Sequence, residues 1–137
     1  MWTCPKCQRK FRNANQQHAC KLVQPEDLFE KRPPGLLALY KKIVSQVGKW
    51  GESRIEGVAP NVVYFKTKST FLGVKVMKDH LLIEFFLEQL EDVPPVSKFL
   101  QTSKHRWVHY VPVDSEKELN KQLLSWMKRS YDLVTQA

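Results

Sequence analysis

Residues 62–88, VVYFKTKSTFLGVKVMKDHLLIEFFLE, are rich in β-branched and aromatic side chains and predict three consecutive short β-strands. Residues 77–80 lie between two of these strands and have the composition of a turn. Val74 and Val76 alternate with Lys75, so one face of the strand is expected to be buried and the other to be exposed to solvent. Such alternation is typical of an antiparallel sheet.

The chain beyond this region predicts one more strand and a terminal helix. Residues 106–113, RWVHYVPV, have strand character, and Pro112 is expected at a sheet edge or a strand end. Residues 91–95 interrupt the pattern. Ser115 and Glu118 have the spacing of a capping box, which predicts a helix that begins there. The expected buried face of this helix consists of Leu119, Leu123, Trp126, Met127, Ser130, Tyr131 and Val134.

Residues 34–47 precede the strands and predict an amphipathic helix. Pro34 suits a first helical position, and Gly48 is expected to end the helix. Its apolar stripe consists of Leu36, Leu37, Tyr40, Ile43, Val44 and Val47. The order of helix, antiparallel strands and helix predicts an α+β fold, with the N-terminal and C-terminal helices packed on the sheet.

Composition restricts the class of protein. The chain has 137 residues, which suits one ordinary domain with a small appendage. No apolar run approaches the roughly 18 residues that span a bilayer, so no membrane partner is expected. The N-terminus lacks a basic-then-apolar leader, so we expect a cytoplasmic location. The net charge of +8 favours an anionic partner, most commonly nucleic acid.

Residues 4–20, CPKCQRKFRNANQQHAC, contain every cysteine of the chain and one histidine. Three cysteines in a reducing compartment argue against a disulfide framework. The set Cys4, Cys7, His18 and Cys20 has the ligand types and pairwise spacing of a closed, structural zinc site. An iron–sulfur cluster or a redox pair is the alternative, although no thioredoxin-like strand and helix surround the first pair.

The ligand segment is also strongly basic, because residues 1–21 contain five basic residues and no acidic one. We therefore predict a zinc-binding finger over residues 1–22, a connector over 23–33 with a short helical turn at 26–30, and the α+β domain over 34–137. The residues expected to contact nucleic acid are Lys6, Arg9, Lys10 and Arg12. Trp2 and Phe11 are expected to pack near the metal, or else to stack on a base.

The runs WTCPKCQRKF…NQQHAC and HRWVHYVPVDSEKELNKQLLSWMKRSY resemble a bacterial family of domains of unknown function, DUF5655. The resemblance implies a short N-terminal zinc-binding motif joined to an α+β domain, and it implies no established activity. Zinc-knuckle families usually have glycine directly after the second cysteine, where this chain has Gln8. A glycine there would ease a positive φ in the turn.

Other chemistry finds little support in the sequence. His80 is expected in a turn, and His105 and His109, about 13 Å apart along one strand, are too distant to share a metal. Glu84 is followed two residues later by Phe86, where a nuclease motif would place lysine. The other candidate carboxylates for acid–base chemistry are Glu88, Glu91 and Asp92. The sequence contains no phosphate-binding glycine loop. We therefore expect a non-enzymatic protein.

The leading hypothesis is a module that binds nucleic acid through a basic zinc finger. Its domain would extend the basic surface through Lys41, Lys42, Lys66, Lys68 and Lys75, with Lys66 and Lys68 on one sheet face. Arg106, Trp107, His109 and Tyr110 either bind a single strand or form a half-buried strand with Trp107 inside. The alternatives are a protein-interaction adaptor that uses the finger for docking, and an enzyme with an unrecognised site in the α+β domain.

Overall fold

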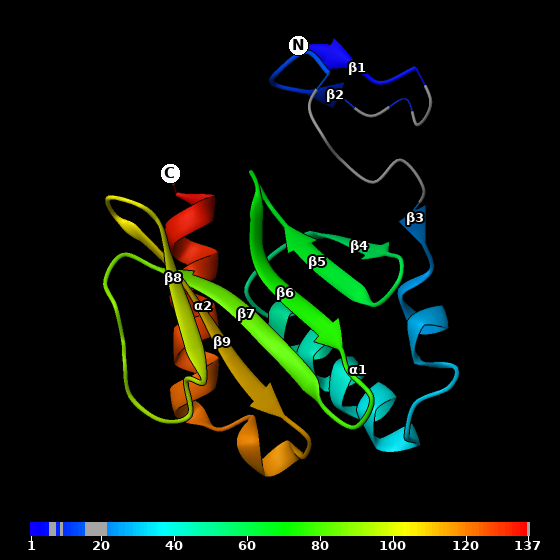
Figure 1. The fold of residues 1–137 in the computed structure, drawn as a ribbon, viewed down its shortest axis with the longest axis vertical. Helices are drawn as coiled ribbons and strands as arrows, with labels where there is room; N and C mark the ends of the chain where they lie inside the picture. The colour runs from blue at the N-terminus through cyan, green and yellow to red at the C-terminus, as the bar shows by residue number, and fades with distance from the viewer. Residues whose placement is uncertain (6–7, 9, 16–21, 137) are drawn as a thin grey trace.

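The computed structural model describes residues 1–5, 8, 10–15 and 22–136 (Figure 1). Its helical segments are the 3₁₀ helices η1 (Pro25–Phe29) and η2 (Glu116–Glu118) and the α-helices α1 (Pro34–Gly48) and α2 (Lys121–Thr135). Its strands are β1 (Trp2–Thr3), β2 (Lys10–Phe11), β3 (Leu22–Val23), β4 (Arg54–Val58), β5 (Val62–Lys66), β6 (Thr70–Val76), β7 (Leu81–Leu87), β8 (Lys98–Ser103) and β9 (Arg106–Val113).

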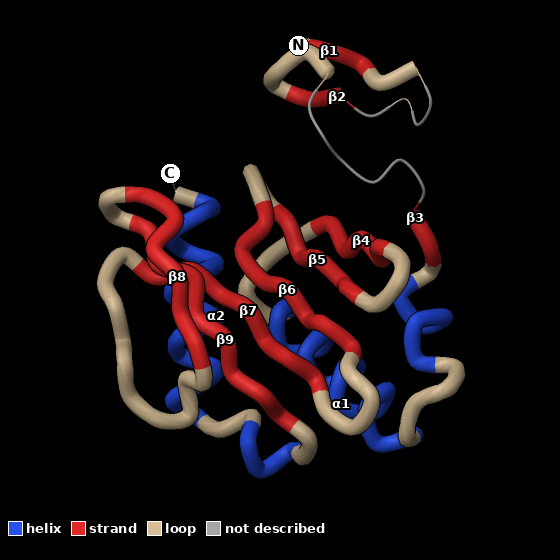
Figure 2. The backbone as a smooth tube through the Cα atoms, in the orientation of Figure 1, coloured by secondary structure: helices blue, strands red, loops and turns tan. Residues whose placement is uncertain are grey.

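Seven strands form one antiparallel sheet in the order β3-β4-β5-β6-β7-β9-β8. Both α-helices lie behind this sheet in Figures 1 and 2, and within the described ranges no helix covers its front face. The predicted α+β class and antiparallel sheet are confirmed. Strands β1 and β2 form a separate hairpin. Among the described segments, no helix has the length and apolarity needed to cross a membrane.

The core lies between the sheet and the two helices. Alternate residues of the central strands face the helices, and cross-strand partners share a face. Val63, Val74, Ile83 and Val111 therefore form one buried row across β5, β6, β7 and β9. Burial of each such side chain contributes roughly 1.5–3 kcal/mol to folding.

Helix α1 begins at Pro34, as predicted, and ends at Gly48, one residue beyond the predicted range of 34–47. The residues of α1 that are buried are Leu36, Leu39, Tyr40, Ile43 and Val47. Leu39 was missing from the expected stripe, whereas Leu37 and Val44 lie at its margin and are only half-buried. The buried face is therefore rotated by about one residue from the one expected.

The predicted start of the C-terminal helix is wrong. Ser115 makes no side-chain capping bond, and Glu118 instead accepts a 2.7 Å hydrogen bond from the Asp114 N–H. Leu119 leaves the helical conformation with ψ of 59°. Helix α2 begins one turn later, where the Asn120 side chain accepts a hydrogen bond from the Leu123 N–H at 3.0 Å. Asn120 is thus the N-cap, and residues 116–118 form only the short helix η2.

Three strands of the seven-stranded sheet, β3, β4 and β8, escaped prediction. Strand β8 is the outer edge of the sheet and all its residues are exposed, so it shows no alternation of burial. Strand β4, RIEGV, contains a glycine and two charges, which weakens its β-propensity. Pro112 lies beyond the last pair of β8 with β9, Lys98 with Tyr110, which agrees with the expected strand end.

Residues 23–33, expected as a connector, pack on the domain. Strand β3 pairs with β4, and Phe29 of η1 is buried in the core. Gly57 makes this approach possible, because a Cβ there would lie 2.5 Å from the Val23 carbonyl oxygen and 3.1 Å from Pro25. The helical turn expected at 26–30 is the 3₁₀ helix η1.

His109 is a buried structural residue. Its Nε2 accepts a 3.0 Å hydrogen bond from the Glu91 N–H, its Nδ1 lies 3.1 Å from the Trp107 carbonyl oxygen, and its ring stacks on Phe85. Burial lowers the pKa of His109, which keeps the ring neutral and able to accept and donate together. His105 precedes β9 in a turn, so the two histidines share no strand.

Candidate functional site

The N-terminal finger is built on the hairpin of β1 and β2. Trp2 and Phe11 are cross-strand partners, and their ring centroids lie 6.0 Å apart. The two rings contact each other, while their expected packing near a metal stays a prediction. They are therefore part of its small apolar core.

A backbone hydrogen bond joins Cys4 and Gln8. Cys4 is buried, and its carbonyl oxygen accepts a 2.8 Å hydrogen bond from the Gln8 N–H. Gln8 has a φ of 64°, the positive value that a glycine would adopt with less strain, and its side-chain amide donates to the Pro5 carbonyl oxygen at 3.2 Å. The departure from glycine at this position therefore leaves the turn intact.

Most of the predicted finger residues lie outside the described part of the chain. These are the ligands Cys7, His18 and Cys20 and the basic residues Lys6 and Arg9. Lys10 and Arg12 are described, and both are exposed. Within the described ranges, no group of three or more potential ligands gathers around one point.

A basic hollow lies between the finger and the sheet, and we call it the cationic cleft. Its volume is about 910 Å³. Its charged lining residues are Lys10, Arg12, Arg54, Glu56, Lys66, Lys68 and Arg106. Lys66 pairs with Glu56 at 2.8 Å, and this pair neutralises part of the positive charge. The cleft thus presents a net positive surface that includes residues from both parts of the chain.

The domain lysines proposed as one basic surface are divided by the fold. Lys41 and Lys42 lie on α1, behind the sheet, and Lys42 pairs with Glu116. Lys66 lies on the helix-free face, whereas Lys68 is in the bend after β5 and not on a strand, so the predicted shared strand face is wrong. Lys66 and Lys68 still line the same cleft.

The strand alternation also divides the aromatic and basic group at 106–110. Arg106 and Tyr110 lie on the helix-free face, and Trp107 and His109 lie on the opposite one. Trp107 is half-buried against Phe99 of β8, with ring centroids 6.0 Å apart, and it is not part of the core cluster. Only Arg106 and Tyr110 can therefore contribute to a surface on the front of the sheet.

A second hollow lies in the middle of the helix-free face, and we call it the tyrosine cavity. One cross-strand row of the sheet crosses it, made of Tyr64, Gly73, Glu84, Tyr110 and Lys98. Its volume is about 350 Å³, and its further lining residues are Val58, Ala59, Pro60, Asn61, Val62, Lys75 and Leu82. The cavity therefore has one apolar end and a row of polar groups.

Gly73 leaves space for the carboxylate of Glu84. A Cβ at this position would be 3.0 Å from Oε1 of Glu84, so the absence of a side chain leaves room for the carboxylate to lean over the strand. Tyr64 and Tyr110 stand on either side of Gly73 and Glu84 in the row. The Nζ of Lys98 lies 4.6 Å from the centre of the Tyr110 ring.

Burial dominates the electrostatics of this cavity. It raises the pKa of the Glu84 carboxyl, and a hydrogen bond from Tyr110 and the charges of Lys75 and Lys98 oppose that rise. The pKa values of Tyr64 and Tyr110 are also raised, first by burial and then by the nearby Glu84 charge. Glu84 is thus a partly desolvated acceptor between two protonated phenols.

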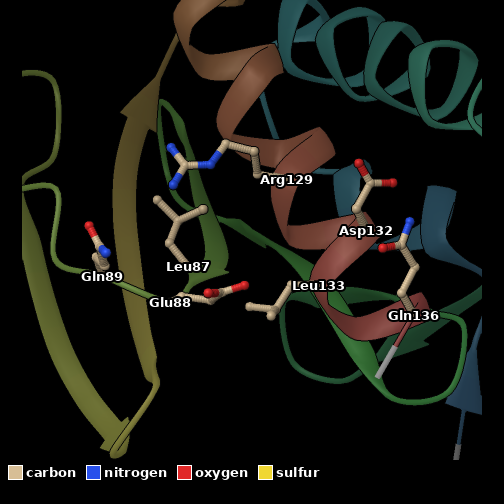
Figure 3. Close-up of a pocket in the computed structure, with 7 residues that line it drawn as sticks. All are labelled: Leu87, Glu88, Gln89, Arg129, Asp132, Leu133 and Gln136. Carbon is tan, nitrogen blue, oxygen red and sulfur yellow. The ribbon is translucent and has the colours of Figure 1, made fainter.

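Figure 3 shows a third hollow, at the end of β7 beside α2. Its charged lining residues are Glu88, Arg129 and Asp132. Arg129 and Asp132 point in different directions; Arg129 lies 3.5 Å from Glu91, and Asp132 pairs with Lys128 at 2.6 Å. This hollow has no convergent set of polar groups and is a weaker candidate.

The tyrosine cavity was not predicted. In the sequence, Glu84 fails to complete a nuclease motif, and no local pattern connects it with Tyr64 or Tyr110. Alternation along each strand would place these residues on one face, but their adjacency depends on the order of the strands. The glycine at position 73, inside an otherwise bulky strand, was the available local signal.

A family model described as a domain of unknown function (DUF5655) matches residues 25–134. The matched residues begin at η1 and end in α2, so they include the whole α+β domain apart from β3. No curated protein and no solved structure matches the chain. Bacterial origin and cytoplasmic location stay predictions from the sequence.

Proposed function

Because the chain belongs to the DUF5655 family, whose description names no function, we propose from its own surface that it binds single-stranded nucleic acid. The observation that carries the proposal is the cationic cleft, where Lys10 and Arg12 of the finger face Arg54, Lys66, Lys68 and Arg106 of the domain. Such a groove attracts the phosphate backbone irrespective of sequence. An open antiparallel sheet with aromatic residues supports a single strand as the ligand.

The finger is proposed to be held by one structural zinc ion. Cys4, Cys7, His18 and Cys20 would supply three thiolates and one imidazole, a donor set that zinc prefers. The buried Cys4 and its backbone hydrogen bond with Gln8 support this fit. The ion would order the loop that contains Lys6, Arg9, Lys10 and Arg12, which are the proposed finger contacts to phosphate.

Salt dependence tests the proposal. A labelled single strand of about 12 nucleotides should bind with an affinity that falls roughly 50-fold between 50 and 200 mM salt, if about four cations contact phosphates. Fluorescence anisotropy across a salt series measures this slope. Negligible binding of both RNA and DNA at low salt would refute the proposal and favour the protein-adaptor hypothesis.

Charge removal locates the binding surface. The double variant Arg54→Gln, Arg106→Gln should weaken binding and make the salt slope shallower by about 1.4, because each of the two side chains neutralises one phosphate. The matched control is the double variant Lys41→Gln, Lys49→Gln, which removes two exposed charges at α1, behind the sheet. Equal losses in the two proteins would mean that net charge, and not the cleft, drives binding.

Gln8 provides a test of the finger turn. Gln8→Val should lower zinc affinity by about tenfold, because a β-branched residue is strained at a positive φ. Gln8→Gly should bind zinc at least as tightly as the wild type. Competition with a chelating dye measures both affinities, and Ala14→Val, at an exposed position without a positive φ, is the control. Equal zinc affinities of the valine and glycine variants would show that this turn does not shape the site.

A further inference from the structure

The tyrosine cavity lies outside the residues that the proposed phosphate contacts use. Its polar groups are Tyr64, Glu84 and Tyr110, with the ammonium groups of Lys75 and Lys98 among its lining residues. Glu84 is half-buried and Gly73 leaves its carboxylate space above the sheet. A half-buried carboxylate with two acceptor oxygens is suited to a ligand that offers two neighbouring N–H donors.

The surroundings of Glu84 favour a flat, partly apolar ligand. Tyr64 and Tyr110 offer aromatic rings on both sides of the carboxylate, and Val62 and Leu82 line the apolar end. Lys75 and Lys98 bring positive charge to the same hollow. An aromatic heterocycle attached to a phosphate would meet all of these groups at once.

We propose that the tyrosine cavity binds a guanine base, with the Glu84 carboxylate accepting its adjacent imino and amino N–H groups. Guanine is selected because it alone among the four common bases presents two neighbouring N–H donors on its Watson–Crick edge. Adenine and cytosine present one amino group beside an acceptor, and uracil presents one imino N–H. Stacking on Tyr64 or Tyr110 and contact of Lys75 with a phosphate complete the site.

The position of the cavity fits a strand that also occupies the cationic cleft. Arg54 and Lys66 pair across β4 and β5, and the next row on the same face is Glu56 with Tyr64. The two rows are separated by two residues, or about 7 Å along the strands. The inference rests on the proposed function, since the same single strand is expected to supply both the phosphates and the base.

Two oligonucleotides test this inference in the intact chain. One is an all-adenine single strand, and the other has a single guanine in its centre. The wild type should bind the guanine-containing strand about tenfold more tightly. Glu84→Gln should reduce that ratio to about one, because an amide cannot accept both N–H groups. Gly73→Ala should also lower the ratio, since its Cβ would displace the carboxylate. The control is Glu88→Gln, at an exposed position just beyond β7, which should keep the affinity ratio of the wild type.

The outcomes separate the two proposals. If both strands bind the wild type equally, guanine recognition is refuted while nucleic-acid binding stands. If neither strand binds at low salt, the proposed function fails and guanine recognition fails with it. A preference that persists in a folded Glu84→Gln protein, verified by circular dichroism, would also refute the role of Glu84.

Discussion

Replacing Cys4 with serine should abolish binding of the proposed zinc ion and unfold the finger, while the α+β domain stays folded. Residues 1–21 contain few apolar side chains, and the described ones pack mainly as the pair Trp2 and Phe11. So little burial cannot fold a segment of this length. Zinc binding to such segments supplies roughly 10–16 kcal/mol, so its loss is the largest effect expected for any single change.

Elemental analysis and NMR measure this result. The wild type should contain about one zinc per chain, and Cys4→Ser should lose it together with the dispersed amide signals of the finger. Thr3→Ser, a similar change at the neighbouring exposed residue, is the control. Full zinc occupancy in the Cys4→Ser protein would contradict the four-ligand assignment. Chelation of the wild type should also weaken nucleic-acid binding, because the proposed finger contacts would lose their order.

Ser130→Ala should lower the free energy of unfolding by about 2–4 kcal/mol, which is large for the removal of one oxygen atom. The Ser130 hydroxyl is completely buried on α2. It donates to the Phe71 carbonyl oxygen at 2.5 Å and accepts from the Phe86 N–H at 2.9 Å. The alanine variant would leave both backbone groups buried without a partner.

The register of the sheet explains why these groups need Ser130. A bulge between β5 and β6 shifts the pairing from Phe65 with Leu72 to Lys66 with Thr70, so Phe71 has no partner on β5. The β6–β7 pairs end at Leu72 with Phe85, one residue before Phe86. Ser130 therefore continues the hydrogen bonding where the strand ladder stops and fastens α2 to two strands.

Urea denaturation measures the loss of stability. The control is Ser125→Ala, an exposed position on the same helix, which should change stability by less than about 0.5 kcal/mol. The urea dependence of the unfolding free energy should be unchanged if only the native state is affected. A Ser130→Ala protein as stable as the Ser125→Ala protein would show that the two backbone groups find other partners.

The finger could be predicted from the sequence to a greater extent than the cationic cleft and the tyrosine cavity. The four candidate ligands and the basic residues of the finger follow from spacing along a short segment, so they could be proposed directly. The cationic cleft could not be, because Arg54 and Arg106 come from strands far apart in the chain. Glu84 and Tyr110 likewise become neighbours only when β9 pairs with β7.

The sequence by itself determined the α+β class, the N-terminal helix to within one residue, and the alternation of buried and solvent-exposed residues in the central strands. These features follow from periodicities of 3.6 and 2 residues, which each segment carries alone. The tertiary structure decided the insertion of β9 between β7 and β8, the bulge that Ser130 completes, and the row of residues across the tyrosine cavity. Those depend on which strands pair and in which register, and such pairing is fixed by contacts between distant segments.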